Sequence, residues 1–467
     1  MKSVLQRAAN QLCRGGCWIL LALVGHAAWS AAADAPVETL PRPRIDAVAS
    51  WRLTGVASCS AAACHNAGSP RGMPRGEYGA WVSHDKHANA FAVLFDPRSQ
   101  RIQRNRGVSV PAHEDSLCLK CHVSQDYERE RGQPGLELAD GVHCEACHGP
   151  AAGWLSTHYL PSWRTISDDA KAVLGFRPLK DLTVRANTCA ECHVGSNRTG
   201  TDVNHDLIAA GHPRLNFEFA NYLANYPRHW SLTAEKQRHP DFEARAWLIG
   251  QLVSARQALD LLAWRAEQAS QNKAPWPEFA EYDCYACHRS LKGLADRPVT
   301  LVPGRMTGKP AWNAWYLALV PHSPGENVER RDTVRKLMSN LAADEKQVAE
   351  AARVCSKDLQ TLLQQIDARP LRPDQVRELL QRVTASPPEE AVANWDSAAQ
   401  HYLAATALYQ ALGDLGMPKQ ERVSLRQALE ALRQTLTFPK GHDGPVGGFD
   451  PTRAAPPYQQ LRLQLHP

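Results

Sequence analysis

Apolar residues recur at helical spacing in two long stretches of the chain. Between Leu248 and Leu262 they step by four and three, which predicts an amphipathic helix. The same spacing from Val334 to Ile366 predicts one long helix. Prolines at positions 370 and 373 then end it, because proline cannot continue a helical hydrogen-bond ladder.

Further helices are expected up to residue 437. One contains the apolar set Val376, Leu379, Leu380 and Val383, and two more run over about 391–413 and 418–437. We therefore predict an antiparallel helical bundle over residues 324–437. Residues 438–467 are rich in glycine and proline, and we expect an extended tail there.

The first 33 residues have a different pattern. Basic residues come first, an apolar run follows over residues 18–24, and small residues end at Ala33, which is the order of a cleaved signal peptide. The alternative is an uncleaved anchor, but the run is short of the roughly 20 apolar residues that a spanning helix needs, and His26 interrupts it. The sequence thus predicts an exported chain that begins near Asp34, in the periplasm or at the cell surface.

The composition is that of a folded protein with two or three domains. The chain has 467 residues, of which 43% are hydrophobic and 22% charged, a balance that argues against disorder and against a multispanning membrane protein. The formal charge is +5 and no basic run stands out, so nucleic-acid binding is not expected. The unusual feature is the content of 13 cysteines and 19 histidines.

Ten cysteines form five pairs, and a histidine directly follows each pair. Four pairs have the C-x-x-C-H spacing of a c-type haem attachment site, and the first has a longer loop, CSAAACH. In such a site two cysteine thioethers hold the haem, and the adjacent histidine binds its iron as the proximal ligand. The predicted attachment residues are Cys59, Cys64, Cys118, Cys121, Cys144, Cys147, Cys189, Cys192, Cys284 and Cys287, and the predicted proximal ligands are His65, His122, His148, His193 and His288.

Three other uses of paired cysteines compete with haem. Zinc ribbons and disulfides do not require a histidine after every second cysteine, and thioredoxin-like motifs come singly. Repetition of the motif with its histidine therefore favours five covalently bound c-type haems. Cys355 has no partner and lies on an apolar helical seam, so we expect a buried core thiol there.

The motifs leave little polypeptide for each cofactor. Five haems share residues 59–288, or about 46 residues each. We therefore predict a mainly α fold, with a loop-rich multihaem cytochrome c domain over residues 34–323 in which closely packed haems form the core. The helical bundle would pack beside this domain.

Three segments around the motifs carry a family resemblance: WVSHDKHANAFAVL (81–94), DGVHCEACHGPAAGWLSTH (140–158) and NHDLIAAGHPRLNFEFANY (204–222). They resemble blocks of the cytochrome c-554-type multihaem proteins, which are related to hydroxylamine oxidoreductase. The resemblance implies distal iron ligands at His87, His158 and His212, with His205 as a further candidate. His113, five residues before Cys118, is a candidate by position.

The chain also departs from this family. The reference proteins have four haems and this chain predicts five, with a lengthened first motif. The C-x-x-C-K signature of the related pentahaem nitrite reductases is absent, since all five proximal positions are histidine.

Three functions remain open from the sequence. The first is an exported pentahaem cytochrome that carries electrons between partner proteins through mostly bis-histidine haems; one candidate partner is a membrane-associated quinol oxidase or reductase complex. The second is an oxidoreductase that acts on hydroxylamine, nitrite or tetrathionate at one haem with an open distal position. The third is an assembly subunit that docks on a partner through the helical bundle.

Overall fold

The computed structural model describes residues 51–70, 72–124, 135–284, 312, 315–367, 370–438, 440 and 449–466. The expected signal peptide lies outside these residues, as do Cys287 and His288 of the fifth motif. The described residues are mainly helical and contain no β-strand, only two isolated bridges. This confirms the predicted fold class.

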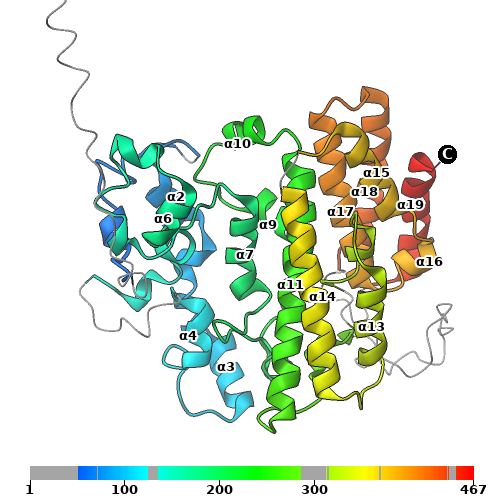
Figure 1. Ribbon diagram of the computed structural model, residues 1–467, viewed down its shortest axis with the longest axis horizontal. Helices are drawn as coiled ribbons and strands as arrows, with labels where there is room; N and C mark the ends of the chain where they lie inside the picture. The colour runs from blue at the N-terminus through cyan, green and yellow to red at the C-terminus, as the bar shows by residue number, and fades with distance from the viewer. Residues whose placement is uncertain are drawn as a thin grey trace, which may run out of the picture.

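The region from residue 51 to residue 240 consists of short helices joined by long loops (Figure 1). Its longest helix has 12 residues. The elements in chain order are η2 (Val56–Cys59), α2 (Glu77–His84), η3 (Lys86–Asn89), η4 (Ala92–Phe95), α3 (Pro97–Arg106), α4 (Ser116–His122), η5 (Leu138–Asp140), α5 (Cys144–His148), η6 (Ala151–Gly153), η7 (Pro161–Arg164), α6 (Asp168–Val173), α7 (Leu182–His193), α8 (His205–Ala210), α9 (Phe219–Asn225) and α10 (Leu232–Arg238). We call it the motif region.

The region from residue 242 onward contains the long helices, and we call it the helical region. Its elements are α11 (Phe242–Ser270), η8 (Phe279–Glu281), η9 (Val320–His322), α13 (Val328–Met338), α14 (Glu345–Asp367), α15 (Pro373–Thr384), α16 (Pro388–Ala391), α17 (Trp395–Asp414), α18 (Lys419–Leu436) and α19 (Pro451–Leu465). Figure 1 shows α11 and α14 side by side between the motif region and α15–α19. Among the described helices none is long and apolar enough to cross a bilayer.

Helix α11 is buried on more of its surface than the sequence predicts. The sequence predicts an amphipathic helix, but polar side chains such as Arg245 and Gln251 are buried along with the apolar ones. The cause is that α7 and α9 of the motif region pack on α11, while α14 and α17 pack on it from the helical region. The apolar core therefore continues across the boundary predicted at residue 324, and the long helices begin before it.

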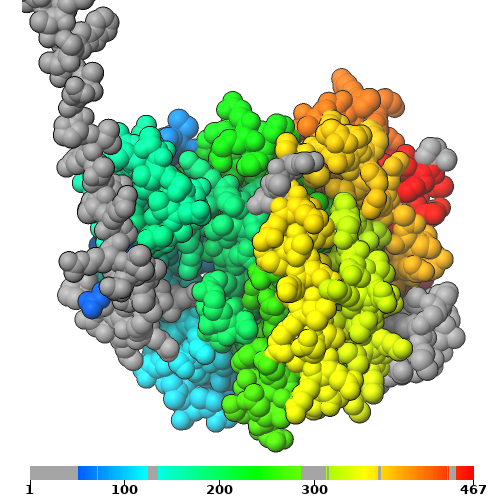
Figure 2. Space-filling view, viewed as in Figure 1, coloured from blue at the N-terminus to red at the C-terminus, as the bar shows by residue number. Residues whose placement is uncertain are grey.

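The single long helix predicted from Val334 to Ile366 is wrong. Two helices, α13 and α14, replace it, with a turn between Met338 and Glu345. In this turn the Asn340 side chain accepts a hydrogen bond from the backbone N–H of Ala342, and Asp344 accepts one from Gln347. Asparagine and aspartate stabilise such turns, so they end one helix and start the next. Figure 2 shows both helices on one face of the molecule.

The extended tail predicted over residues 438–467 is also wrong in its second part, where Pro451–Leu465 form helix α19. Pro451 occupies the first helical turn, where its missing N–H costs nothing, and the Asp450 side chain caps the helix by accepting a hydrogen bond from Thr452. The buried residues Ala454, Tyr458, Leu461 and Leu465 follow helical spacing and pack with α15, α16 and α18. Two internal prolines hid this pattern from the sequence reading.

The remaining helices agree with their predictions. Helix α15 contains Val376–Val383, and the ends of α17 and α18 lie within four residues of the expected limits. Cys355 is 3% exposed on α14, as predicted for a core thiol, and burial raises its pKa to about 11.

Candidate functional site

Short helices present three of the five motifs. Motif two lies on α4, motif three on α5 and motif four at the end of α7, and each helix ends at the motif histidine. Residues three and four apart share one face of a helix, so both cysteines and the histidine of a C-x-x-C-H motif point the same way. Aspartates begin two of these helices, since the side chains of Asp115 and Asp181 accept hydrogen bonds from backbone N–H groups of the first turn.

The histidine of motif one faces a predicted distal ligand. The rings of His65 and His158 lie 6.2 Å apart between centroids and are nearly parallel, at 14°. Each Nδ1 has an acceptor, the carboxylate of Glu77 for His65 and the backbone oxygen of Leu155 for His158. A hydrogen bond at Nδ1 fixes the ring and leaves Nε2 as the metal-binding atom.

The histidine of motif four faces a second predicted ligand. His193 and His87 lie 6.0 Å apart between ring centroids, with nearly perpendicular planes. The carboxylate of Asp85, which is 5% exposed, accepts a hydrogen bond from Nδ1 of His87 at 2.9 Å and a second from the Tyr226 hydroxyl. Burial disfavours the charged form of His87, but the hydrogen bond and charge of Asp85 outweigh it, so the pKa of His87 is raised.

Motif three pairs with a histidine that the sequence did not single out as a ligand. His148 lies 6.2 Å from His229 between ring centroids. His229 follows α9 in the loop before α10, away from the three blocks that carry the family resemblance. No spacing rule pointed to it; the neighbouring aromatic residues Tyr226 and Trp230 were the only local signal.

Motif two has His212 as its neighbour. The two side chains interact closely enough that a charge on His122 would lower the pKa of His212, although burial is the larger cause of that lowering. Nδ1 of His122 donates to the backbone oxygen of Ala90, and Nδ1 of His212 donates to that of Pro213. Packing of α8 against α3 brings His212 to this motif.

The last two candidate ligands differ in their surroundings. His205 begins α8, where its ring contacts Phe279 and its backbone N–H donates to Glu278, just before the fifth motif. It therefore lies beside the chain that leads to Cys284, while His288 is outside the described residues. His113 stacks on Phe95, with ring centroids 4.2 Å apart, and no ring contact joins it to a described motif histidine.

The paired histidines fit a metal between them. A metal–imidazole nitrogen bond is about 2.0 Å long, so two imidazoles on opposite sides of one ion hold their ring centroids roughly 6 Å apart. Three motif histidines meet this spacing with a second histidine. Burial lowers the pKa of His148 and of His193 to about 4, which keeps both rings neutral as a metal ligand requires.

The cysteines of different motifs also meet. The thiols of Cys59 and Cys144 are in hydrogen-bond contact, and so are those of Cys121 and Cys192. Cys147 lies close enough to Cys189 and Cys192 for their charges to interact. In space, therefore, motif one lies next to motif three, motif three lies next to motif four, and motif four lies next to motif two. The described cysteines form no disulfide, and the described residues contain no cluster of three or more side chains suited to a zinc ion.

A buried carboxylate fixes the first and third motifs to each other. Glu145, within CEACH, is 2% exposed and accepts hydrogen bonds from the backbone N–H groups of Thr54, Gly55 and Ala151 at 2.6–3.1 Å. Burial raises the pKa of this carboxyl, and the backbone donors oppose that rise. Glu145 therefore anchors the segment that leads into Cys59.

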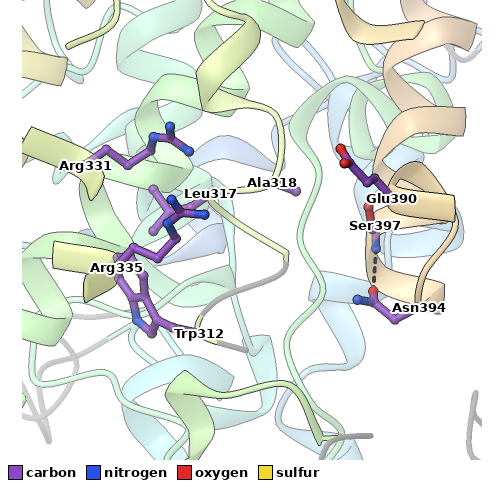
Figure 3. A pocket seen from close by; sticks show the side chains of 8 residues that line it. All are labelled: Trp312, Leu317, Ala318, Arg331, Arg335, Glu390, Asn394 and Ser397. Carbon is purple, nitrogen blue, oxygen red and sulfur yellow. Dashed lines mark hydrogen bonds between the residues drawn. The ribbon is translucent and has the colours of Figure 1, made fainter. Parts of the chain in front are cut away.

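Of two cavities among the described residues, one lies beside a paired histidine and the other lies in the helical region. One, of about 310 Å³, adjoins the chain on both sides of His229 and is lined by Gly72, Tyr226, Arg228, Trp230, Ser231, Leu232 and Thr233. The other, of about 220 Å³, lies between α13 and α17, with Arg331, Arg335 and Trp312 on one side and Glu390, Asn394 and Ser397 on the other (Figure 3). No histidine lines either cavity among the described residues.

Comparison with known proteins supports the haem reading of the motifs. Residues 59–149, which contain the first three motifs, match the family described as cytochrome c554 and c-prime. The chain has no significant match among curated proteins or among solved structures. This part of the chain is thus similar to the c554-type cytochromes, and the match supports a c-type cytochrome of electron transfer with haem c as its cofactor.

Proposed function

We propose that this protein is an exported pentahaem cytochrome that passes electrons between redox partner proteins. The observation that carries the proposal is the pairing of motif histidines with second histidines at the spacing of one shared metal ion. When bound, each haem supplies a one-electron couple between ferric and ferrous iron. Five such sites would use the ten attachment cysteines and five proximal histidines that the sequence predicts.

Distal ligands follow from the described pairs. We assign His158 to the first haem, His212 to the second, His229 to the third and His87 to the fourth. His205 is the candidate for the fifth, from its place beside the segment that leads to Cys284. We assign His113 to none of these haems, because its ring stacks on Phe95 and contacts no described motif histidine.

Contacts between the cysteines support a path for electrons. If attachment sulfurs of two motifs touch, the haem edges bound to them are also close, and electron transfer is fast over such short separations. The contacts of Cys59 with Cys144 and of Cys121 with Cys192, joined through Cys147, give the order one, three, four, two. The protein's part is to fix these neighbours and to surround them with neutral, buried imidazoles.

Paired histidines favour electron transfer over catalysis. An iron with imidazole on both sides has no open position for hydroxylamine, nitrite or tetrathionate. Cyanide added to the ferric protein should therefore leave the spectrum of the first four haems unchanged. Binding of cyanide by one of them would contradict the assigned pairs and favour the enzyme.

The haem count and export can be tested on one preparation. The chain would be expressed in a bacterium that matures c-type cytochromes, and the periplasmic fraction analysed by intact mass. We expect an N-terminus near Asp34 and five haems, with four in a Cys59→Ala/Cys64→Ala variant and five in the matched control Cys355→Ala. Four haems in the unmodified protein would contradict the pentahaem proposal, and retention in the cytoplasm or membrane would contradict export to the periplasm.

A further inference from the structure

Helix α3 carries an unusual concentration of positive charge. Its ten residues include four arginines and no acid. Arg106 pairs with Asp115, whereas Arg98, Arg101 and Arg104 are exposed and form no ion pair among the described residues. These three recur every third residue, so they share one face of the helix. We call them the arginine face.

Exposed apolar side chains lie next to this face. Val93, Phe95 and Val110 are 39%, 51% and 43% exposed, and we call them the apolar patch. Hydrogen bonds hold the patch to α3: Ser99 donates to the oxygen of Val93, Gln100 to that of Phe95 and Gln103 to that of Val110. The arginine face and the apolar patch are therefore parts of one rigid surface, next to the acidic residues Asp96 and Glu114.

This surface lies directly over the second motif. Below it, Leu94 packs in a small buried cluster with Ala112, Leu119 and Val123, and Cys118 lies against the same cluster. The charge of Arg98 also reaches His212, where it adds to the effect of burial in lowering the pKa of this histidine. Figure 1 shows α3 beside α4, the helix that bears the motif, at an outer end of the motif region. A partner seated here would lie close to the second haem.

We propose that the arginine face and the apolar patch form the docking site for a redox protein with an acidic surface. This rests on the proposed function, in which the second haem ends the ordered path from the first. Charge complementarity carries the choice of partner: three unpaired arginines attract an acidic protein and orient it, while the apolar patch loses water on contact. Such interfaces are small and short-lived, which suits rapid electron exchange.

The test measures how fast the holoprotein is reduced by an acidic donor. The probe is a flavodoxin in its hydroquinone form, an acidic one-electron donor, mixed in a stopped-flow instrument at low ionic strength. The test variant is Arg98→Glu/Arg101→Glu/Arg104→Glu. The matched control, Arg372→Glu/Arg382→Glu/Arg433→Glu, makes the same change in net charge at exposed positions of the helical region.

We expect the α3 variant to react at least about tenfold more slowly than the unmodified protein, since oriented charges govern encounter rates. The control variant should react less than about twofold more slowly. Added salt should slow the unmodified protein and reduce the difference. At high salt, a Val110→Ser variant should still react more slowly than the unmodified protein, because it alters an apolar contact that salt does not screen. Equal slowing of both triple variants would overturn the docking site, because only net charge would then matter.

Two further outcomes separate this proposal from the one it rests on. Dithionite, a small reductant, should reduce all variants at the same rate. If dithionite reduces them equally and flavodoxin does not distinguish them, the docking site alone fails; if dithionite cannot reduce the unmodified protein, the proposed function fails as well. Arginine-dependent binding to phosphatidylglycerol vesicles, without an effect on the flavodoxin rate, would assign the face to a membrane and overturn the proposal.

Discussion

The motif region and the helical region bury their side chains in different ways. In the helical region, long apolar seams of α11, α14, α15, α17, α18 and α19 form two extended clusters, one of which also includes buried residues of α7 and α9. The clusters that lie entirely within the motif region have only three or four buried residues each. Many of its ring contacts instead involve histidines. The helical region is therefore built on leucine and alanine packing, and the motif region on the residues that would hold haem.

A histidine pair in the helical region shows that ring spacing alone does not define a haem site. His322 and His401 lie 6.0 Å apart between ring centroids, as the motif pairs do. Neither belongs to a cysteine motif, and Nδ1 of His401 donates to the oxygen of Val383 near the end of α15. This pair caps a helix C-terminus. The combination of paired rings with attachment cysteines is what distinguishes the motif region.

The largest difference between the two regions is expected when a haem is removed from the centre of the proposed path. A Cys144→Ala/Cys147→Ala variant should lose one haem and expose the motif region to trypsin, because its small clusters cannot replace the lost contacts. The helical region should stay protected, since its own apolar clusters remain. Haem content and limited proteolysis with mass analysis would measure this, with Cys355→Ala as the control. Digestion of both regions at the same rate would show that the chain folds as one unit.

The second prediction concerns His229, a proposed ligand that the sequence did not reveal. His229→Ala should convert one haem from low spin to high spin and let it bind cyanide, because His148 would then be the only histidine on that iron. Optical and EPR spectra of the ferric variant would measure the change. His239, in the loop after α10, supplies the control, since His239→Ala should leave the spectra unchanged. An unaltered spectrum in the His229 variant would remove this residue from the ligand set.

A smaller effect is expected from the histidine of the helical region. Burial lowers the pKa of His401 to about 4, and the nearby His322 adds to this while the Val383 carbonyl opposes it. Because the pKa is lower in the folded than in the unfolded protein, stability falls as the pH drops from about 6.5 to about 4, by roughly 3 kcal/mol at most from this group. Thermal unfolding across that range should show a reduced pH dependence in His401→Gln. An identical pH profile in the variant would contradict this assignment.

The smallest predicted change concerns the potential of one haem. The Asp85 carboxylate accepts a hydrogen bond from Nδ1 of His87, which makes the imidazole a more electron-rich ligand and favours ferric iron. Asp85→Asn keeps a hydrogen-bond acceptor but loses the charge, so the potential of one haem should rise without a change of spin state. A redox titration followed by EPR would detect this, and Glu77→Gln, beside His65, should shift a different haem. If both variants shifted the same signal, the assignment of the two pairs would be wrong.

The sequence predicted the chemistry of the site better than its arrangement. Cysteine spacing is local, so it predicts the attachment residues without knowledge of the fold, and the segments around His87, His158 and His212 were recognisable by resemblance. His229 was missed because pairing with His148 depends on how the loop between α9 and α10 folds back, which no local pattern encodes. His113 was favoured by its position alone, and the structure places it against Phe95.

Helix prediction failed where local chemistry competed with apolar spacing. The periodic pattern from Val334 to Ile366 ran through Asn340 and Asp344, whose side chains form turns instead. In α19 the opposite occurred, because prolines suggested an extended tail while Ala454, Tyr458 and Leu461 packed as a helix. The burial of α11 on all sides was not predictable because it depends on contacts from both regions.

The central claim is that two histidines hold each of the first four haem irons. EPR of the ferric holoprotein at low temperature, with haem quantified on the same sample, tests it most directly. The account predicts low-spin signals that integrate to at least four haems. The nearly perpendicular rings of His87 and His193 should give a highly anisotropic signal, and the nearly parallel rings of His65 and His158 an ordinary rhombic one. A high-spin signal from two or more haems would contradict the claim.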